Sequence, residues 1–245
     1  MLIEAWLTLK WELQSSAGGV LTDELYPFAV GKFDSLVKEK YPKRIALDSN
    51  LAPIEITPYT PRFQYAAEKN GARHKLLQIG PGLATINYLT DYSWDSFKDD
   101  VFYLISSINE VYEEPLDFST VSLRYRNAIP FDYNEESLID FLNSNFNIEI
   151  NLPSNIPGKK AKIKHPINSN LKFSYNLQDP LDKAIFVVAT GLKKEEKGKT
   201  IPIIVQETEI ISELDNVPNV QNAKLFSKWL ESANQVANNW NFSEK

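Results

Sequence analysis

Residues 3–13 read IEAWLTLKWEL, and apolar and polar side chains alternate along this stretch. The apolar positions are Ile3, Ala5, Leu7, Leu9, Trp11 and Leu13. Because successive side chains of a strand point to opposite faces, this alternation predicts a strand with one buried face. Trp6 adds one aromatic side chain to the opposite, polar face, beside Glu4 and Thr8.

Outward from this strand, the first half of the chain reads as a series of further elements. A helix is expected next, with Pro27 in its first turn because a deeper proline would clash with the preceding turn. Residues 43–67 are extended and rich in proline, and Gly80-Pro81-Gly82 joins the two strands of a hairpin. Ser93 is expected to cap a long amphipathic helix. These elements predict a first β-α-β4-α unit over residues 1–116.

The second half can be read in the same order. It begins with a strand at Val121, and Asn134 is expected to cap the helix that follows. Further strands are expected at residues 146–152, 171–177, 184–190 and 201–205. An amphipathic helix that reaches Trp240 completes the series. The order predicts a second β-α-β4-α unit over residues 117–245, packed with the first as one body.

This order of elements also predicts the fold class. Alternating strands need one face covered, and amphipathic helices supply the cover. We therefore expect an α+β fold in which curved antiparallel sheets pack on long helices. The same order occurs in TATA-box-binding-protein-like and helix-grip folds, which is an analogy of topology and not of function.

Composition and motifs narrow the classes of function. The chain has 245 residues, no cysteine and a net charge of −6. The absence of cysteine excludes thiolate metal sites and thiol nucleophiles, and it fits a cytoplasmic protein. Neither a signal peptide nor a membrane-spanning segment is expected. The sequence contains no G-x-S-x-G, Walker A or H-E-x-x-H motif, so we predict a protein without a catalytic centre, metal or cofactor.

Four segments resemble a family of sporadically distributed bacterial and archaeal proteins of about this length. They are LIEAWLTLKWEL (residues 2–13), LLQIGPGLATINYLTDYSWDSF (76–97), VSLRYRNAIPF (121–131) and WLESANQVANNWNF (229–242). The family's recurrent positions in the second and third segments are Asn87, Tyr92, Trp94, Phe97, Arg124, Tyr125 and Asn127. Many members have a histidine in the last helix where this chain has Asn234. The resemblance implies a role beside anti-phage defence genes and carries no activity with it.

Arg124 and Arg126 are the strongest candidates for a binding site. Two positions apart on a strand, their side chains point to the same face. Paired guanidinium groups can hold a phosphate or a carboxylate of a ligand, or they can pair with acids on a covering helix or on a partner chain. Asn87 and Asn127 are expected near them, because asparagine is unfavourable in a strand unless its side chain is hydrogen-bonded.

Two further surfaces are candidates for binding. The segment PGKKAKIKHP contains Lys159, Lys160, Lys162 and Lys164. These lysines are candidates for contacts with nucleic-acid phosphates; alternatively, the segment is a solvated loop without a binding role. Trp229 and Trp240 lie eleven residues apart and share one face of the last helix, with Phe242 just beyond it. They are expected either to pack in the core or to anchor an interface.

Three functions remain open at this stage. The leading hypothesis is a non-catalytic subunit or regulator of a prokaryotic anti-phage defence or toxin-type system, which binds a partner protein such as its effector or nuclease. The second is a nucleic-acid-binding module that assists an effector nuclease. The third is a helix-grip protein that holds a small ligand between sheet and long helix, in a pocket lined by Trp6, Tyr88 and Tyr175.

Overall fold

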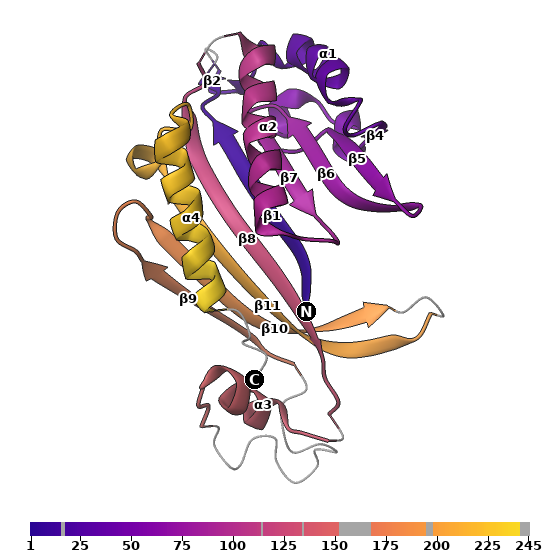
Figure 1. Ribbon diagram of the computed structural model, residues 1–245, viewed down its shortest axis with the longest axis vertical. Helices are drawn as coiled ribbons and strands as arrows, with labels where there is room; N and C mark the ends of the chain where they lie inside the picture. Colours follow the sequence, from indigo (N-terminus) through magenta and orange to yellow (C-terminus); the bar gives the residue numbers. More distant parts are fainter. Residues whose placement is uncertain (16–17, 114, 134, 152–167, 195–197, 241–245) are drawn as a thin grey trace.

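The computed structural model describes residues 1–15, 18–113, 115–133, 135–151, 168–194 and 198–240. The strands of its main sheet are β1 (Leu2–Trp11), β4 (Lys43–Ala46), β5 (Phe63–Lys69), β6 (Ala72–Gly80), β7 (Leu83–Tyr88), β8 (Phe118–Pro130), β9 (Asn170–Asn176), β10 (Lys183–Lys194) and β11 (Thr200–Glu213). Within the described ranges they form one antiparallel sheet in the order β4-β5-β6-β7-β1-β8-β11-β10-β9 (Figure 1). The short strands β2 (Gln14–Ser15) and β3 (Leu21–Thr22) pair separately.

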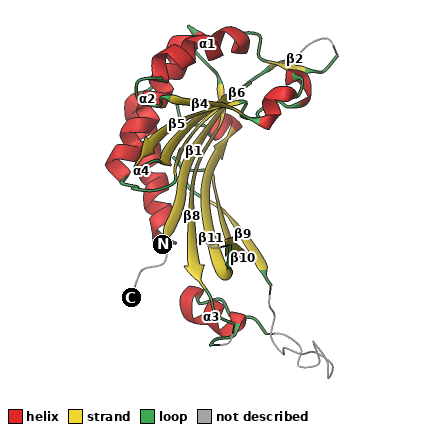
Figure 2. Cartoon of the chain, turned by 90° about the vertical axis from the view of Figure 1, so that its right-hand side faces the viewer, coloured by secondary structure: helices red, strands yellow, loops and turns green. Residues whose placement is uncertain are grey.

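Three long helices cover one face of this sheet. They are α1 (Tyr26–Val37), α2 (Trp94–Tyr112) and α4 (Ala223–Asn239), while α3 (Leu138–Phe146) lies beyond the end of the strands (Figures 1 and 2). Single 3-10 turns occur at η1 (Asp48–Leu51), η2 (Ile54–Ile56) and η3 (Leu214–Asn216). The chain is therefore an α+β protein whose large antiparallel sheet has one helix-covered face and one face that we call the open face.

The alternation along β1 is confirmed and decides which residues reach each face. Ala5, Leu7 and Leu9 are fully buried against the helices. Leu7 lies between Ile86 of β7 and Leu123 of β8, which are also fully buried. The even-numbered residues of β1 consequently point to the open face.

The long helix α2 is fixed to the sheet by a buried carboxylate as well as by its apolar stripe. Asp100 is only 2% exposed. It accepts a hydrogen bond from Lys75 Nζ at 2.9 Å, pairs with Lys40, and accepts another from the Tyr88 hydroxyl. Burial alone would raise the pKa of Asp100, but the hydrogen bonds from Lys40, Tyr88 and Lys75 outweigh it and lower that pKa.

The predicted hairpin around Gly80-Pro81-Gly82 is present, and steric constraints explain why both of these positions are glycine. Gly82 has a φ of +70°, and a Cβ at Gly80 would lie 2.0 Å from the Thr60 carbonyl oxygen. The Gly82 N–H donates to Asp23 Oδ2 at 3.0 Å. The backbone donor that a phosphate-binding loop would offer is thus already used by a carboxylate of this chain.

The second half of the chain departs from its predicted outline. Helix α3 begins at Leu138 and is capped by Ser137, whose Oγ accepts from the Asp140 N–H at 3.1 Å. The predicted cap, Asn134, lies outside the described residues, and it stands before the residue that caps this helix. The prediction of a strand at 146–152 is wrong for residues 147–151, which form no ladder.

The alternating apolar residues of that segment serve a different purpose. Phe146, Ile148 and Ile150 pack against a small second core, separate from the main one. The fully or nearly buried members of this second core are Phe131, Leu138, Phe141, Leu142, Val188 and Ile204. In the described residues the second half therefore has three strands, β9 to β11, between its helices, where the first half has four, β4 to β7.

The two glycines Gly80 and Gly31 are expected to respond oppositely to alanine. Gly80→Ala forces a Cβ against backbone, so the free energy of unfolding should fall by about 2 kcal/mol or more. Gly31 lies in α1 with no atom within 4 Å of the added Cβ, so Gly31→Ala should raise stability by up to about 1 kcal/mol. Urea denaturation of both variants measures this, and equal effects would contradict the packing described here.

Replacing Asp100 is expected to change how stability depends on pH. Because the folded-state pKa is lowered, the carboxylate's contribution is fully present above its usual value of 3.8 and is lost as the pH falls through the folded-state pKa. Asp100→Asn should therefore cost about 2 kcal/mol near neutral pH and progressively less in acid. Denaturant titrations at neutral and acidic pH test this, with Asp99→Asn at the exposed neighbour as the control. A difference from wild type that stays constant in acid would contradict it.

Candidate functional site

The open face carries a cluster of charged side chains around one tryptophan. Trp6 of β1 lies between Asn87 of β7 and Arg124 of β8 in the register of the sheet. Glu4 lies opposite Arg126, and β11 places one glutamate opposite each arginine. We call this cluster the Trp6 patch, and its members are Glu4, Trp6, Asn87, Arg124, Arg126, Glu207 and Glu209.

Each arginine of the patch binds two carboxylates. Arg126 contacts Glu207 Oε2 through Nη2 at 2.7 Å and through Nε at 2.9 Å, and its Nη1 contacts Glu4 Oε2 at 3.2 Å. Arg124 contacts Glu209 Oε1 through Nη2 at 2.6 Å and Glu207 Oε1 through Nη1 at 3.3 Å. The arginines are therefore paired within the chain, but the prediction of acids on a covering helix is wrong, because the acids lie on the neighbouring strands β1 and β11.

The electrostatic balance of the patch is unfavourable for an added anion. Three carboxylates surround two guanidinium groups, so the ionised patch carries one net negative charge. The side chains of Arg124 and Arg126 are 28% and 35% exposed. A phosphate could bind them only by displacing glutamates that are already in hydrogen-bond contact.

Trp6 is held in place by the same two arginines. The guanidinium carbons of Arg124 and Arg126 lie 4.8 Å and 5.0 Å from the centre of the indole ring, within the range of cation–π attraction. Asn87 Nδ2 donates to Glu4 Oε1 at 3.1 Å, which fixes the carboxylate on the other side of the cluster. The result is a half-buried aromatic ring in a fixed ionic frame.

Asn127 does not join this cluster. It is one residue beyond Arg126 on β8, so its side chain points to the helix-covered face, where it is 8% exposed and lies opposite Gln206. The sequence prediction that Asn87 and Asn127 lie near the arginines therefore holds for Asn87 alone. The alternation of side chains along β8 is sufficient to separate the two asparagines.

The helix-covered face contains a chain of hydroxyl groups that the sequence did not reveal. Tyr125 donates its hydroxyl to Asn234 Oδ1 at 2.8 Å and lies 2.7 Å from the Tyr92 hydroxyl. Burial raises the pKa of Tyr125 and raises that of Tyr92 to about 12. Both therefore stay neutral hydroxyl groups at ordinary pH, and Asn234 links α4 to the centre of the sheet.

The tryptophans of the last helix have separate positions. Trp229 is fully buried, and its Nε1 donates to Ser212 Oγ at 2.9 Å. Trp240 packs its ring 5.2 Å from Tyr175 and 5.8 Å from Phe186. Trp229 is thus a core residue and not a surface anchor. The remaining predicted binding residues lie outside the described residues; they are Phe242, Lys159, Lys160, Lys162 and Lys164.

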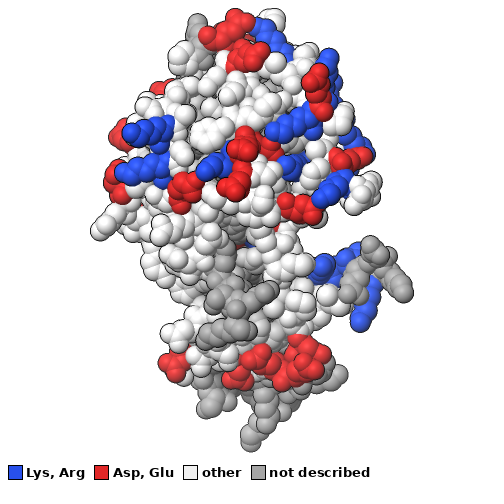
Figure 3. Space-filling model, in the orientation of Figure 1, with Lys and Arg blue, Asp and Glu red and all other residues white. Residues whose placement is uncertain are grey.

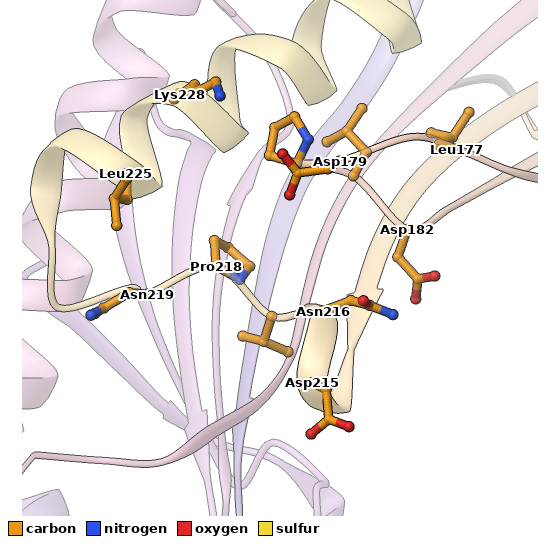
Figure 4. Close-up of a pocket in the computed structure, with 12 residues that line it drawn as sticks. Leu177, Asp179, Asp182, Asp215, Asn216, Pro218, Asn219, Leu225 and Lys228 are labelled. Carbon is orange, nitrogen blue, oxygen red and sulfur yellow. The ribbon is translucent and has the colours of Figure 1, made fainter.

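A cavity of about 390 Å³ lies between the β9–β10 turn, the segment before α4 and the first turns of α4 (Figure 4). Its charged lining residues are Asp179, Asp182, Asp215 and Lys228. Figure 4 shows Asp182 and Asp215 on the opposite side from Lys228, with their carboxylates turned away from it. Asp182 and Asp215 therefore do not converge with Lys228 on one point, so the Trp6 patch remains the better candidate for a site.

Comparison with known proteins adds no assignment to this site. No family model matches the chain, and no curated protein matches it significantly. In the described part of the chain, no three histidine, aspartate or glutamate side chains are grouped so as to hold a metal ion. No described helix is long and apolar enough to cross a bilayer.

Glu207 should be the residue on which the ionic frame most depends, because it contacts both arginines. We expect Glu207→Ala to lower the free energy of unfolding by about 1–3 kcal/mol, since it leaves two partly buried cations short of a partner. Glu213 on the same strand is 49% exposed and lies 3.7 Å from Lys183, so Glu213→Ala should change stability by about 0.5 kcal/mol or less. Chemical denaturation compares the two, and similar losses would show that the frame is not a unit.

Proposed function

We propose that this chain is a non-catalytic, cytoplasmic subunit or regulator of a prokaryotic anti-phage defence or toxin-type system, and that it binds a partner protein through the Trp6 patch. The observation that supports this is the state of Arg124 and Arg126. Both are already held by carboxylates of the chain, and both lie over the Trp6 ring on a face that none of the described helices covers. The resemblance to the sporadically distributed family supports the defence context.

The composition and rigidity of the patch favour a protein as the occupant. Tryptophan and arginine are enriched among the residues that contribute most to binding between proteins. The guanidinium groups are fixed before binding, so less side-chain entropy is lost when a partner covers them. Because each is already paired, a partner does not have to bury an isolated charge. A partner with an apolar centre and a polar rim fits these conditions.

A nucleic-acid-binding role is the second candidate, and one observation favours it. Three described lysines near the tip of the β10–β11 hairpin, Lys193, Lys194 and Lys199, are exposed. Figure 1 shows this hairpin projecting from the body, and Figure 3 shows basic side chains gathered on the same projection. Such lysines can contact phosphates, as can Lys159–Lys164 of the predicted basic loop. The patch itself opposes this role, since its net charge is negative.

The third hypothesis, a ligand pocket lined by Trp6, Tyr88 and Tyr175, requires correction. Trp6 points to the open face, whereas Tyr88 is buried on the helix-covered face with its hydroxyl on Asp100. Tyr175 packs against Trp240 at the edge of the sheet. Because the sheet separates Trp6 from the other two side chains, the three cannot line one pocket.

We also propose that the two halves are related units of TATA-box-binding-protein-like or helix-grip topology. The order of the sheet supports this. Outward from the central β1–β8 pair, β7, β6 and β5 follow on one side, and β11, β10 and β9 follow on the other. A long helix, α2 or α4, follows the last strand of each half. In the described residues, the second half has no counterpart of β4.

Trp6→Ala is expected to abolish recovery of the partner when the tagged chain is used to capture proteins from its native host. The physical reason is the loss of the central aromatic surface, which typically costs about 2 kcal/mol or more at a hot spot. Phe28→Ala is the matched control, because Phe28 is 73% exposed but lies on α1. Recovery of one stoichiometric protein by wild type and the control, but not by Trp6→Ala, is the expected result.

Nuclease treatment of the lysate separates the two candidate functions. We expect partner recovery to survive nuclease and to be unchanged when Lys193, Lys194 and Lys199 are replaced by glutamate. Direct nucleic-acid binding would instead weaken steeply with salt and would be lost in this variant. Recovery that depends on nucleic acid, or hydrolysis of nucleotide or nucleic acid by the purified chain, would overturn the proposed function.

A further inference from the structure

The two edges of the sheet are protected to different degrees. Edge strand β4 is four residues long, follows Pro42 and carries Lys43 and Arg44, which pair with Glu68 at 2.6 Å and with Asp34 at 3.5 Å. Short length, charge and proline are the usual means of preventing strand addition. Edge strand β9 is seven residues long, contains no proline and has one charged residue, Lys172. Its register with β10 has no bulge.

The outward-facing backbone groups of β9 follow from its pairing with β10. The Leu177 N–H donates to the Asp182 carbonyl at 2.7 Å, and the Thr190 N–H donates to the Ser169 carbonyl at 3.0 Å. Odd-numbered residues of β9 therefore bond to β10, because bonded and unbonded positions alternate in an antiparallel pair. The backbone groups of Asn170, Lys172, Ser174 and Asn176 consequently point away from the sheet, and no described strand pairs with them.

We propose that β9 pairs antiparallel with β9 of a second copy of this chain, about a two-fold axis at Phe173. The sequence of the strand, NLKFSYN, is close to symmetric about that residue. In this register Asn170 lies opposite Asn176 of the second copy, Leu171 opposite Tyr175, and Lys172 opposite Ser174. An isologous contact of this kind requires such self-complementarity.

Two other registers are less favourable. A shift of one residue would place the outward-facing backbone groups of one β9 opposite residues of the other β9 whose backbone groups are already bonded to β10. The two strands could then not form hydrogen bonds with each other. Centring the axis on Lys172 would place two lysines directly opposite each other, which is destabilising. Centring it on Phe173 pairs all seven residues and leaves each lysine opposite a serine.

The side chains give this pairing an apolar component. Tyr175 is 49% exposed, and Phe173 and Leu171 are half-buried on the same face. Pairing would bring the two copies of Phe173 together and cover each Tyr175 with Leu171 of the second copy. This contact is independent of the proposed partner-binding role, because the Trp6 patch lies on β7, β1, β8 and β11.

Substitutions at Ser174 test the pairing with opposite expected signs. Ser174→Lys places lysines opposite both copies of Lys172 and should raise the dissociation constant of the dimer roughly tenfold, whereas Ser174→Glu should lower it. Sedimentation equilibrium measures both against wild type, which is expected to have about twice the 28.0 kDa mass of one chain. Ser174 is exposed, so neither change should prevent folding. A wild-type chain that is monomeric throughout, or a dimer that ignores both changes, would overturn the proposal.

A cysteine test checks the register, because the chain has no cysteine of its own. Under oxidised glutathione, Phe173→Cys should form a disulfide-linked dimer, since residue 173 is expected to face itself in a closely spaced pair. Tyr175→Cys is the matched control and should stay monomeric under denaturing electrophoresis, because residue 175 faces residue 171. Equal cross-linking of both, or of neither, would exclude this register. Strand addition by a different protein would show as a heterodimer, and the Phe173→Cys variant would then form no disulfide between two copies.

Discussion

The structure depends on β1, because this strand needs hydrogen-bond partners along both edges and suitable surroundings for the side chains on both faces. It is hydrogen-bonded to β7 on one edge and to β8 on the other, so both halves of the chain meet at this strand. Its odd residues must be apolar because α2 and α4 cover that face. Its even residues must be compatible with solvent and with charged neighbours. The alternation in residues 3–13 meets both requirements at once.

Two buried or partly buried carboxylates extend this arrangement to the helices and loops. Asp100 of α2 contacts Lys40 and Lys75 and accepts a hydrogen bond from the Tyr88 hydroxyl. It remains charged because these donors offset the cost of burial. Asp23 binds the Gly82 N–H and also accepts from the Tyr112 hydroxyl at 2.8 Å. Both carboxylates therefore have hydrogen-bond partners within the chain.

The charged groups of the Trp6 patch are likewise paired within the chain. Arg124 and Arg126 would be a phosphate site if they stood alone on the strand, but three glutamates pair with them and leave the patch with a net negative charge. Our two proposals therefore rest on an aromatic ring in a fixed ionic frame and on the edge of β9 that no described strand covers. The two contacts that we propose, with a partner protein at the Trp6 patch and with a second copy at β9, therefore lie on different strands.

The sequence by itself determined the features that depend on local pattern. These are the two faces of β1, the hairpin at residues 80–82, the start of α2 after Ser93, and the shared face of Arg124 and Arg126. Tertiary structure alone decided which acids those arginines meet, since Glu4 is 122 residues from Arg126 in sequence and Glu207 is 81. It also placed Ile148 and Ile150 against a second core instead of in a strand, because an alternating segment becomes a strand only when another strand supplies its hydrogen bonds.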